Sequence, residues 1–148
     1  MKLKSIQQSI IAAALLSTSV FAFAANQQVL CPSVDLIKKS TSELNTVSFM
    51  GGKYAVWSLN YAFDDANLHW QVMSYAAAPD FNTAFGVGQN NVKSVSGQID
   101  KYPTDTKDFY ICRYSGGQDS VAAISFKDEN AKFKFASFDL NLLNLNSH

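Results

Sequence analysis

The chain has 148 residues, of which 47% are hydrophobic and 13% aromatic, and its 12 Lys and Arg balance 12 Asp and Glu. The longest basic run is Lys38-Lys39, whereas a nucleic-acid-binding face or a polybasic membrane surface needs clustered positive charge. The composition therefore argues against both kinds of partner, and it is apolar enough to build a packed core.

The first residues predict a secretory signal peptide. Two lysines precede an apolar stretch over residues 10–24, which ends in the small-residue cleavage site Ala22-Phe23-Ala24. The stretch is shorter than the roughly 20 apolar residues that a membrane span needs. We expect cleavage of residues 1–24 between Ala24 and Ala25, which leaves residues 25–148 as one periplasmic or secreted domain without a membrane anchor.

Two cysteines remain after cleavage, Cys31 and Cys112. An even pair in an oxidising compartment predicts a disulfide, which would stabilise the fold by about 4 kcal/mol through closure of a long loop. A lipid anchor on Cys31 does not fit, because the expected cleavage site lies several residues upstream. A reactive thiol is the alternative for Cys31, since it would precede a helix N-terminus.

The first predicted helix covers residues 33–40, with Leu44 as its furthest end. Ser33 suits the N-cap, and Lys38 and Lys39 suit the C-terminal end of the helix dipole. A second helix is predicted over residues 80–96, where apolar residues recur every three or four positions after Asp80 as N-cap. Gly86 and Gly88 weaken this helix and suggest close packing against a sheet.

Between these helices the sequence predicts a β-hairpin. Residues 54–63 and 68–77 have strand composition, and Asp64-Asp65-Ala66-Asn67 has turn chemistry. On the second strand Leu68, Trp70 and Val72 share one face, which we expect to be the core side.

Three more strands are predicted after a polar linker at residues 100–106. They cover residues 108–115, 120–127 and 132–140, and the short polar segments between them indicate a meander. The predicted fold is α+β, in the order α-β-β-α-β-β-β. An antiparallel sheet of about five strands carries two helices on one face and one disulfide.

Motifs of catalysis and of metal binding are missing from the sequence. No C-x-x-C, H-E-x-x-H or calcium-loop spacing occurs, so no metal site is predicted. No G-x-S-x-G occurs either, and we interpret Asp64-Asp65 as turn chemistry rather than as a pair of catalytic carboxylates. No catalytic residue is assigned.

One group of residues leaves a ligand site open. His69, Met73 and Tyr75 share the strand face opposite Trp70 and Val72, and all three residue types serve as axial haem ligands. The alternative, which we favour, is that they are ordinary residues on the more solvated sheet face or are packed under a flap. Haem is therefore the alternative cofactor, and none is the first expectation.

Four segments together resemble a known group of proteins: CPSVDLIKKS, LHWQVMSYA, FNTAFGVGQNNVKSVSG and FYICRY. The mature chain is similar to short exported proteins of unknown function from Legionella and related gamma-proteobacteria, some of which are labelled haem-binding. The resemblance implies one exported domain with paired cysteines and transfers no catalytic residue.

The leading hypothesis for function is an exported, non-catalytic binding or interaction module whose partner is an unknown protein or small ligand. The first alternative is a protein that binds haem or a similar planar ligand through the face of His69. The second alternative, from a different class, is a small secreted enzyme.

Overall fold

The computed structural model describes residues 28–128. The predicted signal peptide, residues 1–24, and the predicted strand at residues 132–140 lie outside this range. The helices are α1 (Val34–Lys39), the 3-10 helix η1 (Ser40–Glu43) and α2 (Phe81–Lys93). The strands are β1 (Thr46–Met50), β2 (Lys53–Trp57), β3 (Phe63–Asp65), β4 (Leu68–Ala76), β5 (Val95–Gln98), β6 (Thr104–Asp105), β7 (Phe109–Gly116) and β8 (Val121–Phe126).

The strands form one antiparallel sheet in the order β1-β2-β4-β8-β7-β5, with β3 paired to β4 and β6 paired to β7. The α+β class is confirmed, but the expected five strands are wrong, because the described part of the chain has eight. The predicted strand over residues 54–63 is divided into β2 and β3. β1, β5 and β6 lie where no strand was predicted.

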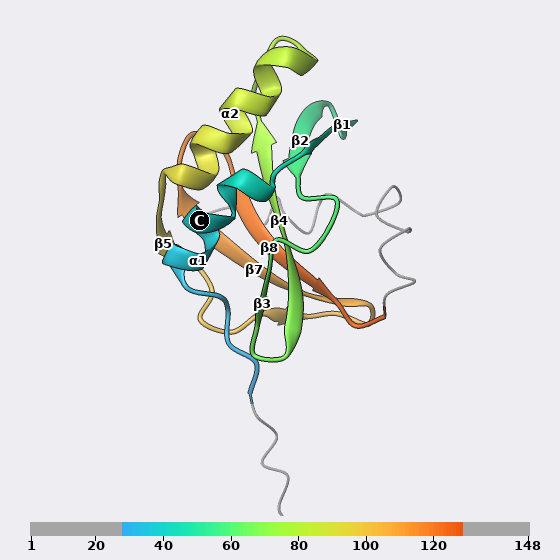
Figure 1. Ribbon diagram of the computed structural model, residues 1–148, viewed down its shortest axis with the longest axis vertical. Helices are drawn as coiled ribbons and strands as arrows, with labels where there is room; N and C mark the ends of the chain where they lie inside the picture. The colour runs from blue at the N-terminus through green and yellow to red at the C-terminus, as the bar shows by residue number, and fades with distance from the viewer. Residues whose placement is uncertain (1–27, 129–148) are drawn as a thin grey trace, which may run out of the picture.

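β8 occupies the centre of the sheet, between β4 and β7 (Figure 1). It pairs along one edge with Gln71 to Ser74 of β4 and along the other with Phe109 to Tyr114 of β7. The part of the predicted meander that joins residues 120–127 to residues 132–140 lies outside the described residues.

The first helix begins as predicted and ends in a tighter turn. The Ser33 hydroxyl accepts a hydrogen bond from the Leu36 backbone N–H, which confirms the N-cap. At the other end, the hydroxyls of Ser40 and Thr41 donate to the carbonyls of Ile37 and Lys38. Such side-chain bonds compete with the helical pattern, and the chain continues as the 3-10 helix η1.

The second helix is N-capped by Asp80, whose carboxylate accepts from the Thr83 backbone N–H at 2.8 Å. It ends at Lys93 and not at residue 96, because Val95 already pairs with Gly116 in the sheet. Of its two glycines, Gly88 lies against Val56 of β2, where a Cβ atom would come within 2.5 Å of the valine Cβ.

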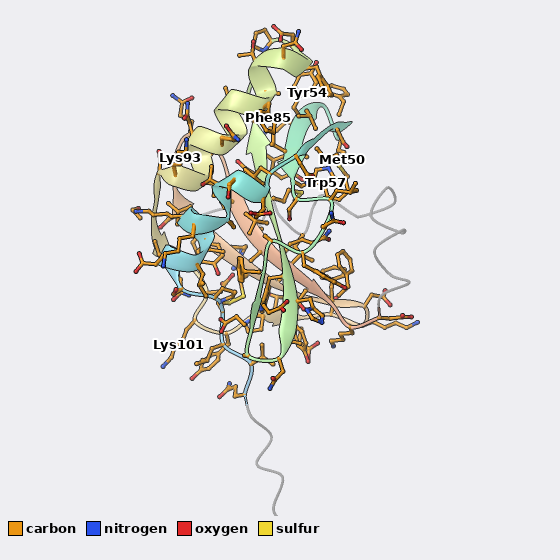
Figure 2. The ribbon with its side chains drawn as sticks, viewed as in Figure 1. Met50, Tyr54, Trp57, Phe85, Lys93 and Lys101 are labelled. Carbon is orange, nitrogen blue, oxygen red and sulfur yellow. A yellow bond between two sulfur atoms is a disulfide. The ribbon has the colours of Figure 1, made fainter. Side chains whose placement is uncertain are left out.

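Both helices lie on one side of the sheet, which we call the first face (Figure 1). Figure 2 shows Phe85 of α2 near Tyr54 of β2, where the helix crosses the strand. The predicted core side of β4 is confirmed, since Trp70 and Val72 are fully buried here. The other residues that the sheet contributes to this core are Val56, Ala76, Val95, Cys112, Tyr114, Val121 and Ala123.

The opposite side of the sheet, the second face, is also apolar. Its buried centre consists of Ala55, Met73, Tyr75, Ile111, Ala122 and Ile124, and Met50, Trp57, Phe109 and Phe126 pack around it. Figure 2 shows Met50 and Trp57 on the side of the molecule away from Lys93 of α2. Of the two environments expected for Met73 and Tyr75, the more solvated face is wrong, since these residues are 2% and 5% exposed.

The segment before α1 is tied to β5 and β7. Cys31 forms the predicted disulfide with Cys112, so the reactive-thiol alternative is wrong. The Cys31 backbone N–H donates to the Lys101 carbonyl, and the Tyr114 hydroxyl donates to the Pro32 carbonyl at 2.7 Å. The disulfide indicates a non-cytoplasmic, oxidising location. Within residues 28–128 no helix is long and apolar enough to cross a membrane.

Candidate functional site: the β3–β4 hairpin

The three predicted ligand residues lie in two different environments along β4. The His69 side chain is 54% exposed, near the hairpin turn. Met73 and Tyr75 lie four and six residues further on, buried in the second face. Gln71 stands between them and is itself buried, with its amide donating to the carbonyls of Ser58 and Leu59. The fold therefore does not bring Met73 and Tyr75 together with His69.

The chain between β2 and β3 leaves the regular ladder at residues 58–62. Ser58 is buried, and its hydroxyl accepts the Val72 backbone N–H at 3.0 Å. This side-chain bond, with the two bonds from the Gln71 amide, replaces regular strand pairing over the segment. Leu59 is consequently 56% exposed, and Tyr61 reaches the surface next to the hairpin.

The hairpin turn is tighter than the sequence predicted. Ala66 and Asn67 form it alone, with φ values of 51° and 61°. Positive φ at both central residues is the geometry of a two-residue hairpin turn. Asp64 and Asp65 are thus strand residues of β3, which corrects their interpretation as turn residues, and Asp64 pairs across the strands with His69.

Three side chains meet on the exposed side of this hairpin. The Asp64 Oδ1 atom lies 2.5 Å from His69 Nδ1. The Tyr61 ring stacks on the His69 ring, with the ring centroids 4.6 Å apart and the planes inclined by 27°. The name hairpin cluster is used below for Tyr61, Asp64 and His69.

The hairpin cluster is suited to recognition. Asp64 engages Nδ1 and orients the imidazole ring, so Nε2 is the nitrogen through which His69 would bind a ligand or a metal. The stacked rings add an aromatic surface, and an exposed carboxylate lies beside them. A hydrogen-bonding nitrogen, a flat apolar surface and a negative charge are therefore available within one small area.

A hollow lies between α2 and the β7–β8 turn. Its volume is about 200 Å³, and it is lined by Val87, Asn90, Asn91, Ser94, Gly117 and Gln118. The Asn91 amide is already engaged, donating to the Tyr75 carbonyl and accepting from the Gln118 N–H. Because none of the lining residues is titratable, the hairpin cluster is the stronger candidate. No three or more His, Cys, Asp or Glu side chains within residues 28–128 are grouped to hold a metal ion.

Sequence reasoning found His69 but not its neighbours. Asp64 and His69 become partners only if the turn has two residues, and the run Asp-Asp-Ala-Asn suggested four. Tyr61 was assigned to a continuous strand, although Ser58 and Asn60 are polar interruptions that indicate a break.

No protein-family model, no curated protein and no solved structure matches this chain. The resemblance drawn from CPSVDLIKKS and FYICRY stays a prediction, and the function is inferred from the geometry of the hairpin.

Proposed function

We propose that this protein is a small exported binding module without catalytic activity, and that the hairpin cluster is the centre of its contact surface. One observation carries the proposal: an exposed histidine is stacked on a tyrosine and held by a carboxylate. Aromatic side chains that expose a polar atom are typical of residues that dominate binding energy at interfaces.

The local backbone supports this proposal. Ala66 and Asn67 are the only non-glycine residues with positive φ within the described chain, and this conformation is unfavourable for alanine. Backbone strain of this kind tends to persist at sites with a function. Here the turn keeps Asp64 and His69 opposite each other, so the cluster is organised before any ligand arrives.

The compartment fits a binding module. The disulfide indicates an oxidising location, and delivery to the periplasm or the medium is the further expectation from residues 1–24. Both cysteines are used in the disulfide, so neither is available as a nucleophile, and the secreted-enzyme alternative is not carried further.

The test uses the mature chain, immobilised and exposed to an envelope extract of the organism that produces it. A Tyr61→Ser, His69→Ala double variant should retain at least about tenfold less of a component that the wild type binds. Tyr102→Ser, which alters an exposed aromatic residue elsewhere, should retain the same amount as the wild type. Quantitative mass spectrometry of the bound material measures both. Identical bound sets for the wild type and the double variant would contradict the hairpin as the contact surface.

A second candidate function is binding of haem or a similar planar ligand. It is favoured by the Asp64–His69 contact, because histidine ligands of metals commonly give their other nitrogen to a carboxylate. His69 fits an axial ligand, since its ring is oriented and exposed. Met73 and Tyr75 do not fit the same site, because they are buried in the second face.

Haemin titration of the mature chain tests this candidate. Binding through His69 should shift the Soret band, and the shift should disappear in His69→Ala and weaken in Asp64→Asn. Tyr102→Ser serves as the control and should behave as the wild type does. A free-haemin spectrum that the wild-type chain leaves unchanged would remove haem from consideration.

A further inference from the structure

The second face of the sheet has an apolar centre that extends over four strands. It consists of Ala55 of β2, Met73 and Tyr75 of β4, Ile111 of β7, and Ala122 and Ile124 of β8. All the described strands lie in the sheet, and both described helices lie on the first face. Antiparallel sheets commonly leave one face to water, but such a face is polar, and this one is not.

The exposure of these side chains shows that something lies over them. In a single chain with no partner present, all six central residues are at most 5% exposed. Lys53 of β2 reaches over one of them, with its Nζ 6.0 Å from the centroid of the Tyr75 ring. A single lysine does not cover residues as large as Met73 and Ile124 as well. Both described helices lie on the first face, so the described elements do not supply this cover.

The path of the backbone distinguishes the two ends of the chain as sources of this cover. At the N-terminal end, Cys31 belongs to the core of the first face. At the C-terminal end, Phe126 packs on the second face against Phe109, with ring centroids 6.2 Å apart, and the chain leaves β8 there. Residues 129–148 therefore start beside the second face.

The composition of residues 129–148 matches such a role. The segment is rich in large apolar side chains, which are Phe133, Phe135, Phe138, Leu140, Leu142, Leu143 and Leu145. Extended chain covers about 3.3 Å per residue, and four strands are spread over roughly 15 Å, so the segment is long enough to cross the face more than once.

We propose that residues 129–148 pack across the second face and complete a second hydrophobic core, on the side of the sheet opposite the helices. The sheet then has the cover on both sides that an apolar sheet requires. This inference goes beyond the proposed function, because it concerns the buried face of Met73 and Tyr75 and not the hairpin cluster.

The Tyr75 hydroxyl gives independent support. It is buried without a hydrogen-bond partner among the described residues, and an unpaired buried hydroxyl is costly. The same burial raises the pKa of Tyr75 to about 12. Residues 129–148 carry Ser137, Asn141 and Asn144, whose side chains offer acceptors to this hydroxyl once the segment is in place.

Photo-crosslinking of the full mature chain tests the proposal. A p-benzoylphenylalanine residue replaces Phe135 in a dilute equimolar mixture of light and heavy isotope-labelled chains. We expect crosslinks to peptides that carry Met73 or Ile111, with both peptides from one isotopic species. The same replacement at Phe81, which is exposed at the start of α2, should give no such crosslinks.

Each other outcome overturns the proposal. Crosslinks that join light to heavy chains would show that a second copy covers the second face. Crosslinks confined to α1 or α2, or none to the second face, would place residues 129–148 elsewhere.

A second measurement avoids any risk that the bulky probe disturbs packing. After cleavage of the signal peptide only Met50 and Met73 remain as methionines, so methyl labelling gives two signals. The Met73 methyl contacts Trp57, its partner across the strands, and should show further contacts to phenylalanine rings. Only these further contacts should disappear in a variant with Phe133, Phe135 and Phe138 replaced by Leu. An unchanged Met73 resonance in that variant would overturn the proposal.

Discussion

Gly86 and Gly88 lie two residues apart in α2 and have opposite surroundings. A Cβ at position 88 would lie 2.5 Å from the Cβ of Val56, whereas one at position 86 would meet nothing within 4 Å. We expect Gly88→Ala to lower the free energy of unfolding by about 1–3 kcal/mol through overpacking. Gly86→Ala should raise it by about 0.5–1 kcal/mol, because alanine loses less backbone entropy in a helix.

Urea unfolding of the two variants beside the wild type measures both changes. Equal stabilisation by both substitutions would show that α2 does not approach β2 as closely as the structure has it. Gly86→Ala is the matched control, since it makes the same chemical change in the same helix.

Arg113 and Asp100 form a two-pronged ion pair between β7 and the end of β5. The guanidinium Nε and Nη2 atoms each lie 2.7 Å from a carboxylate oxygen, and the side chains are 23% and 16% exposed. Hydrogen bonds from Arg113 hold the pKa of Asp100 below its usual value. The folded state therefore binds a proton less readily than the unfolded state, and this contribution to stability is lost as the pH falls.

The expected result is a pH-dependent difference between the wild type and Asp100→Asn. At pH 7 the wild type should be more stable by about 1 kcal/mol, a modest value because the pair is partly solvated. The difference should shrink below about pH 4, where the unfolded carboxyl takes up its proton, and vanish once the folded one does. Chemical denaturation at several pH values measures this, with the exposed Asp108→Asn as control. A difference that is constant down to pH 2 would be evidence against the ion pair.

At the level of elements, the helices were the easiest part to predict. Ser33 and Asp80 are residues whose side chains cap a backbone N–H wherever a helix starts, and both caps are present. The C-terminal end of α2 was misplaced, because Val95 and Ile99 continue the helical spacing although Val95 is taken by its pairing with Gly116. The end of α2 is therefore set by strand pairing with a distant segment, which no local sequence pattern indicates.

The strands that were missed are those held by distant partners. β6 has two residues within a polar linker and exists through Ile111 and Tyr110 of β7. Tyr61 joins the hairpin cluster only because buried bonds from Gln71 and Val72 bend residues 58–62 out of the ladder. The candidate site was therefore predictable at His69, where residue type gives a signal, and unpredictable where geometry alone creates the contact.

The segment before α1 is the element most dependent on a covalent bond. The disulfide joins residues separated by 81 positions, and the Pro32 carbonyl accepts from Tyr114 and Gln98 beside it. We expect a Cys31→Ser, Cys112→Ser double variant to lose about 2–5 kcal/mol of unfolding free energy.

Addition of a reductant during guanidinium unfolding checks the disulfide prediction. It should lower the midpoint of the wild type to that of the double variant and leave the double variant unchanged. Tyr114→Phe, which removes one hydrogen bond in the same place, should cost only about 1 kcal/mol and keep its response to reductant. A wild type that is indifferent to reductant would contradict the predicted contribution of the disulfide.

The molecule consists of two regions that differ in packing and exposure. The helices, the disulfide and the first face form a densely packed body, whereas the β3–β4 hairpin carries the exposed cluster at the opposite end of β4 from α2 (Figure 1). Binding through such a hairpin would leave the packed body undisturbed. We therefore expect substitutions at His69 to change binding while the unfolding midpoint shifts little.

The central place of β8 sets the order in which this chain completes its sheet. β1 to β4 are made first, and β7 follows α2, yet the two halves of the sheet are joined only when Val121–Phe126 enters between β4 and β7. Met73 pairs with Ala122 only after β8 has joined the sheet. This pairing is long-range and therefore slow to form. If residues 1–24 direct the chain through a translocation channel, as the sequence predicts, the sheet is completed near the end of that passage, after β8 has left the channel.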